Sequence, residues 1–294
     1  MSIKSFEAKF MGQGRLIYMK TFETKFIGQD GNEFFVQGWE PETQPRAVIA
    51  LVHGLGEHTG RYAHVAQALT DAGYALVGFD TRGHGKSGGS RGHTPSYDAL
   101  MNDISAFLSM LGEKYPGSPL FLYGHSMGGN QVINHALRRR PKIKGVIVTG
   151  PWLKLSFEPP PVKVALGRVF DRIFPSFAQA NGLDTNGLSH DPEVIRLYDN
   201  DPLNHDRISL RLFVGIYDSG LWALDHAAEL SLPLLLMHGG ADPVTSAEAS
   251  RKFANEAGKN VTLKIWDGLY HEIHNEPEQA EVFKMMIEWL DKHL

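Results

Sequence analysis

The motif Gly124-His125-Ser126-Met127-Gly128-Gly129 follows an apolar run that ends at Tyr123 and precedes a stretch of helical periodicity from Met127 to Arg139. A serine between two glycines at a strand–turn–helix junction is typical of a nucleophile elbow, in which the hydroxyl sits on a tight, strained turn. The glycines lack the Cβ atoms that would clash in such a turn, and the helix places backbone N–H groups beside the hydroxyl. We therefore predict that Ser126 is a nucleophile.

Short apolar runs recur along the rest of the chain, with helical stretches such as Tyr62–Ala72 and Tyr97–Leu111 between them. Runs without alternation are typical of strands covered on both faces, and this rhythm indicates a mostly parallel sheet. The runs are Ala47–Val52, Ala75–Phe79, Leu120–Tyr123, Val146–Val148, Leu234–Met237 and Val261–Trp266. With the elbow, they predict an α/β-hydrolase fold: a mostly parallel eight-stranded sheet with helices on both faces and a helical cap insertion.

The rhythm breaks between about residues 151 and 230, where Pro159-Pro160-Pro161 begins a region of helical spacing. We interpret 151–230 as a helical cap over the sheet edge at which open α/β sheets bind ligands. The core is then split into residues 19–150 and 231–294.

A short duplication lies near the N-terminus, where residues 4–13 (KSFEAKFMGQ) recur as residues 20–29 (KTFETKFIGQ). The second copy leads into Asp30-Gly31, which is a hairpin turn signal. We therefore expect the second copy to form the first strand of the core, and residues 1–18 to be an N-terminal extension.

Composition narrows the possible functions. The chain has 294 residues, a net charge of -4 and no clustered basic surface, so a nucleic-acid partner is not expected. The absence of cysteine excludes disulfides and thiolate nucleophiles, and no histidine pair has a convincing metal-ligand spacing, so we expect no cofactor and no metal. No signal peptide and no apolar run of about 20 residues is present. We expect a cytoplasmic protein.

A serine hydroxyl needs a base, and in this fold the expected chain order is serine, acid, histidine. Asp242 follows one late apolar run and His271 follows the next. We predict that His271 accepts the Ser126 proton while Asp242 orients its ring. Asp218 and Asp267 are rival acids, but Asp218 falls inside an apolar helical pattern and Asp267 is close to His271 in sequence.

Acyl transfer also needs an oxyanion hole. We predict that the backbone N–H of Met127, directly after the nucleophile, is one donor. The second donor is expected in the Gly-rich loop His53–His58, and its candidate is the N–H of Leu55.

Motifs spread over the chain resemble those of the monoacylglycerol lipases, a lysophospholipase-like group of α/β hydrolases. The motifs are His53–His58, Gly60–Tyr62, Asp80–Ser87, Gly124–Gly129, Tyr198–Leu203 and Tyr270–Glu272. The resemblance covers residues 20–294. It implies hydrolysis of a monoacylglycerol to glycerol and a fatty acid, and a cap that opens on an acyl tunnel and sits against lipid surfaces.

The resemblance further implies that polar groups hold the glycerol head at Glu57, Arg61, Tyr198 and His274. Buried polar groups that fit glycerol hydroxyls penalise substrates that lack them. The alternative for Glu57 and Arg61 is a salt bridge that fixes the loop.

Other interpretations remain open. The same triad would serve a lysophospholipase, a general carboxylesterase or an acyltransferase, and a non-catalytic lipid-binding protein is a remote alternative. The apolar face of residues 162–174 either packs on the core or forms a docking patch for a membrane or micelle. In the second case the protein would be peripheral to a membrane.

Overall fold

The computed structural model describes residues 4–12 and 15–294, with side chains described from Met19 onward. Within these residues the main sheet has nine strands in the order β1-β2-β3-β5-β4-β6-β7-β10-β11. The strands are β1 (Lys4–Gly12), β2 (Arg15–Ile27), β3 (Glu33–Glu40), β4 (Val48–Val52), β5 (Ala75–Phe79), β6 (Leu120–His125), β7 (Gly145–Thr149), β10 (Leu234–Gly239) and β11 (Val261–Trp266). All pairs from β5 to β11 are parallel, and the pairs from β1 to β5 are antiparallel.

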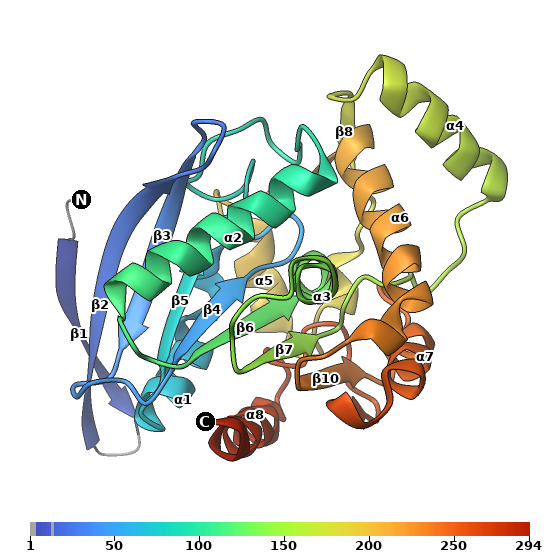
Figure 1. Ribbon diagram of the computed structural model, residues 1–294. Helices are drawn as coiled ribbons and strands as arrows, with labels where there is room; N and C mark the ends of the chain where they lie inside the picture. Colours follow the sequence, from blue (N-terminus) through green and yellow to red (C-terminus); the bar gives the residue numbers. More distant parts are fainter. Residues whose placement is uncertain (1–3, 13–14) are drawn as a thin grey trace.

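Helices cover both faces of this sheet (Figure 1). They are α1 (Ala63–Asp71), α2 (Tyr97–Lys114), α3 (Met127–Arg139), α7 (Ala247–Ala257) and α8 (Gln279–His293). Strand β4 shows why its apolar run is continuous: Val48 and Val52 join a core with α2 and α3, whereas Ile49 joins a second core with α1 and α8. A strand buried on both faces has no solvent-facing positions for polar residues.

The predicted α/β fold is confirmed, and all six apolar runs form strands at nearly the expected bounds. The eight expected strands are β2 to β7 with β10 and β11. Strand β1 adds a ninth, because residues 4–12 pair antiparallel with β2 at the sheet edge (Figure 1). Only residues 4–7 of the first copy lie opposite the second copy, at residues 20–23, and the rest of β1 pairs with residues 15–19 between the copies.

The pairing of β2 with β3 bears on the predicted boundary between the N-terminal extension and the core, at residue 19. It runs from Lys20 opposite Glu40 to Ile27 opposite Glu33, entirely within the second copy of the repeat. Residues 1–3 and 13–14 of the expected extension lie outside the described residues. The core pairing therefore does not depend on residues 1–18, and their status as an extension stays a prediction.

The segment between β7 and β10 forms the expected helical region at the other end of the molecule (Figure 1). Its elements are α4 (Pro161–Ile173), β8 (Ala178–Ala180), α5 (Pro192–Asn200), β9 (Arg207–Ser209) and α6 (Leu210–Asp225). Helix α4 lies outermost against α6, and an ion pair between Arg168 and Asp218 joins the two helices at 2.6 Å. Among the described residues, no helix is long and apolar enough to cross a membrane.

We predict that a chain beginning at Met19 folds and keeps its activity. The pairing of β2 with β3 remains intact, and only the edge strand β1 and the first four residues of β2 are lost. Thermal melting followed by circular dichroism should show a midpoint within a few degrees of the full chain, with ester turnover preserved. Loss of folding would mean that residues 1–18 belong to the core.

Candidate active site

Ser126 occupies a strained turn between β6 and α3, with φ of 54° and ψ of -115°. Only two non-glycine residues in the described part of the chain have positive φ, and Ser126 is one of them. The glycines of the motif make this turn sterically possible. A Cβ on Gly124 would lie 2.5 Å from the carbonyl oxygen of Gly128, and a Cβ on Gly128 would lie 2.0 Å from that of Val52.

Three predicted side chains meet at this turn. The Nε2 atom of His271 lies 2.9 Å from Ser126 Oγ, and its Nδ1 atom lies 2.7 Å from Asp242 Oδ2. Asp242 and His271 come from the loops after β10 and β11, which end at the same sheet edge as β6 because these strands are parallel. A proton can pass from Ser126 to His271 along this chain of contacts while the carboxylate fixes the imidazole tautomer.

The carboxylate of Asp242 accepts several hydrogen bonds besides that of His271. Oδ1 accepts from the backbone N–H groups of Val244 and Thr245 at 2.7 and 3.0 Å, and Oδ2 accepts from the Thr245 hydroxyl at 2.8 Å. His238 Nε2 lies 2.9 Å from Oδ2. Burial alone would raise the pKa of Asp242, but the charge of His271 and the His238 hydrogen bond hold it well below its usual range. Asp242 is therefore ionised when His271 accepts the serine proton.

The base itself is also buried. Burial lowers the pKa of His271, but the attraction of the Asp242 carboxylate outweighs it, so the pKa lies above the ordinary histidine value. Neither rival acid reaches this ring. Asp218 pairs with Arg168 in the cap, and Asp267 is exposed.

The predicted donors of the oxyanion hole are the backbone N–H groups of Met127 and Leu55. Met127 is the first residue of α3, so its N–H has no acceptor within the helix. Leu55 lies in the turn after β4, and both it and Ser126 line one cavity. Glu57 holds that turn, because its Oε1 atom accepts from the Gly54 N–H at 2.6 Å and from the Tyr62 hydroxyl at 2.8 Å.

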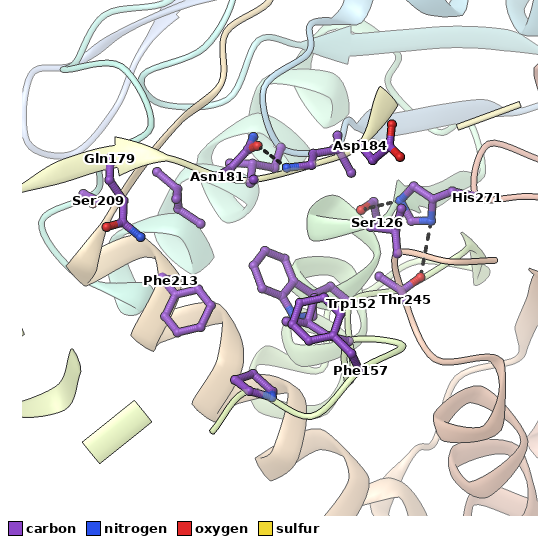
Figure 2. A pocket seen from close by; sticks show the side chains of 18 of the residues that line it. Ser126, Trp152, Phe157, Gln179, Asn181, Asp184, Ser209, Phe213, Thr245 and His271 are labelled. Carbon is purple, nitrogen blue, oxygen red and sulfur yellow. Dashed lines mark hydrogen bonds between the residues drawn. The ribbon is translucent and has the colours of Figure 1, made fainter. Parts of the chain in front are cut away.

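The cavity that contains Ser126 and His271 has a volume of about 1080 Å³, and much of its wall comes from the segment between β7 and β10 (Figure 2). Most of its wall is apolar, with Trp152, Val164, Phe170, Ile208 and Phe213 among the lining residues. One end is polar and is lined by Glu57, Tyr198 and Glu272.

Only Glu57 and Tyr198, of the four positions expected to hold glycerol, line the cavity. Arg61 lies behind them, with 10% of its side chain exposed, and pairs with Glu57 at 2.5 Å and with Glu272 at 2.7 Å. The salt bridge of the alternative interpretation is thus present. His274 is buried, and its ring stacks on Tyr62 with centroids 5.1 Å apart.

Sequence reasoning missed Glu272 and the contact of His238 with Asp242. Glu272 directly follows the expected base, and His238 precedes the expected acid by four residues, so proximity was the only available signal. His58 contacts Asp201 of the cap at 2.8 Å, and His135 is 1% exposed.

Comparison with known proteins extends these observations. A family model described as "Serine aminopeptidase, S33" matches residues 43–278. The chain is 35% identical to the monoacylglycerol lipase of Mycolicibacterium smegmatis, over 87% of this chain and 92% of that protein. The crystal structure of the Paleococcus ferrophilus monoacylglycerol lipase is 40% identical and superposes with a TM-score of 0.81, covering 88% of this chain and 99% of that chain.

A longer protein also matches. An uncharacterized abhydrolase domain-containing protein of Dictyostelium discoideum is 34% identical over 90% of this chain, but the chain spans only 28% of its length.

We predict that turnover of a soluble ester falls as the pH is lowered, with a midpoint in kcat/KM above the ordinary histidine pKa of about 6.5. The raised pKa of His271 is the reason, because only the neutral ring can accept the serine proton. In Asp242→Asn, kcat should drop by about 10⁴-fold and the midpoint should move to lower pH, since the carboxylate that stabilises the imidazolium is gone.

The matched control is Asp267→Asn, which removes an exposed carboxylate in the loop before His271. Its pH profile should match that of the unmodified protein. An unchanged profile in Asp242→Asn would exclude Asp242 as the orienting acid.

Proposed function

The chain belongs to the Serine aminopeptidase, S33 family and, within it, is related to the monoacylglycerol lipases; from this premise we propose that it hydrolyses monoacylglycerols to glycerol and a fatty acid. The observation that carries the proposal is the position of Ser126 and His271 in the wall of a large apolar cavity with one polar end. Such a cavity suits an ester with one long acyl chain and one small polar alcohol.

The proposed reaction is acyl transfer in two steps. Ser126 attacks the ester carbonyl while His271 takes its proton, and the N–H groups of Leu55 and Met127 stabilise the oxyanion. Protonated His271 then donates to the departing glycerol oxygen. A water molecule, activated by His271, hydrolyses the acyl-enzyme and releases the fatty acid. The 2.9 Å contact of His271 Nε2 with Ser126 Oγ supports this assignment of nucleophile and base.

The polar end of the cavity supports a role in holding glycerol. Glu57 and Glu272 offer carboxylate oxygens and Tyr198 offers a hydroxyl within one short stretch of wall. Arg61 acts behind this wall and orients both carboxylates, and His274 lies behind it with its ring stacked on Tyr62. An ester whose alcohol part carries no further hydroxyl group could not use these polar groups, which puts it at a disadvantage against a glycerol ester.

The cap gives reason to propose contact with a lipid surface. Large apolar side chains stand exposed on α4 and beside it, around the wall of the cavity; they are Phe157, Val162, Leu166, Val169, Phe170, Ile173, Phe174 and Phe177. Their exposed fractions run from 46% to 70%, which is unusual for a helix that packs on a core. We therefore favour the docking interpretation of this face, with a cytoplasmic enzyme that binds membranes or micelles peripherally.

The first test is release of fatty acid from a panel of monoacylglycerol, lysophospholipid, triacylglycerol and short soluble esters. We expect a preference for monoacylglycerol and a loss of at least about 10⁴-fold in kcat for Ser126→Ala, because the nucleophile is removed. Serine-dependent turnover that favours short esters would retain the mechanism and refute the lipase assignment. Full activity in Ser126→Ala would refute both, and binding without turnover would favour a lipid-binding protein.

A second test addresses the cap. Val169→Ser with Phe170→Ser should reduce turnover of emulsified monoacylglycerol several-fold more than turnover of a soluble ester, because only the emulsion requires docking. Leu197→Ser is the matched control, since Leu197 is 56% exposed but lies on α5 and outside the cavity wall. Equal losses on both substrates in the double variant would instead indicate a packing defect.

A further inference from the structure

The polar end of the cavity carries an excess of negative charge. Two carboxylates, Glu57 and Glu272, line the wall on the side of His271, and each residue is only 2% exposed. Their counter-ion, Arg61, is not among the residues that line the cavity. A bound head group therefore faces two carboxylates, and the single cation stands behind them.

Arg61 has little capacity left for a ligand. Its Nη1 atom donates to Glu57 at 2.5 Å and to Glu272 at 2.7 Å, and its Nη2 atom donates to the second Glu272 oxygen at 2.7 Å. The ring of Tyr198 covers the guanidinium at 4.7 Å from its centroid. The bidentate geometry that would recognise a phosphate is already used by Glu272.

Two histidines near these carboxylates, His274 and His125, do not supply a compensating charge. Burial lowers the pKa of His274 to about 3 and holds the pKa of His125 well below its usual range, so both rings are neutral. Burial would raise the pKa of Glu272, but the charge of Arg61 outweighs it and keeps this pKa well below its usual range. Glu272 is therefore ionised at neutral pH.

The remaining charged side chains in the cavity wall lie in the cap. They are Lys163 on α4 and Asp184 in the loop after β8, and they offset each other. No lysine or arginine lines the polar end among the described residues, although anionic head groups are usually bound by such side chains.

We propose that this end of the cavity rejects esters with an anionic head group, and that Glu272 is the residue that determines this specificity. The inference rests on the proposed function, because it concerns the alcohol part of the same substrate. Glycerol can donate its hydroxyl protons to Glu57 and Glu272. A phosphate monoester in the same place would meet two like charges, and their repulsion disfavours its binding.

The test compares two esters with the same acyl chain, lauroylglycerol and lauroyl lysophosphatidate, with lauroyl diglycerol as a larger uncharged alcohol. The unmodified enzyme should cleave both neutral esters and cleave the anionic ester poorly. Glu272→Gln keeps the shape of the side chain and one oxygen acceptor for Arg61 but removes one charge. It should raise the ratio of anionic to neutral kcat/KM by about tenfold or more, because one unit charge at head-group distance is worth that much in a protein-like dielectric.

The matched control is Glu278→Gln, which removes an exposed carboxylate from the same loop and should leave the ratio unchanged. Should Glu272→Gln lose turnover, the binding of the same lipids is measured by calorimetry in Ser126→Ala with and without Glu272→Gln, where the same shift in ratio is expected. An unchanged ratio in both measurements would overturn the inference, as would rejection of lauroyl diglycerol together with the anionic ester. Failure of the proposed function is a separate result, namely a preference of the unmodified enzyme for short soluble esters over lauroylglycerol.

Discussion

The positive φ of Ser126 is the constraint on which the rest of the site depends. Such a conformation costs a non-glycine residue about 1–3 kcal/mol, so the surroundings must hold it in place. They do so through the backbone: the Ser126 N–H donates to Thr149 of β7, and its carbonyl accepts from Trp152 and from Asn130 of α3. The close approach of α3 to β4, which only Gly128 permits, completes this support. The Ser126 hydroxyl is therefore held beside His271 by a fixed backbone.

Two buried clusters of charged residues flank His271 and have different roles. Asp242 with His238 and Thr245 lies at the Nδ1 side and sets the tautomer and basicity of the ring. Arg61 with its two carboxylates ties the Leu55 turn to the residue that follows His271, across 211 positions of sequence. Removing one charged partner from either cluster would leave a buried charge unpaired. The free-energy cost of that unpaired charge is far larger than the cost of burying the complete cluster.

The sequence predicts what local chemistry determines. The strand–glycine–serine–helix order predicts the elbow, and the order of strands predicts which loops carry an acid and a histidine to Ser126. It does not predict Glu272 as a partner of Arg61, because nothing local distinguishes it from any other loop carboxylate. The ninth strand was missed because residues 15–19, which pair with most of β1, lie outside the repeat that marked the second copy as a strand.

The segment between β7 and β10 is attached differently at its two ends. Near the polar end, backbone bonds join it to the site: the Glu272 N–H donates to Leu188, and the His205 N–H donates to Gly56. At the other end α4 rests on α6 with its apolar face exposed. A head group is thus enclosed by polar walls that hydrogen bonds hold in place. An acyl chain instead contacts the wall at α4, which is attached to the rest of the molecule by few contacts. Discrimination by this cavity should therefore be sharp for the alcohol and tolerant for the acyl chain, since unpaired polar groups cost more than a missing methylene.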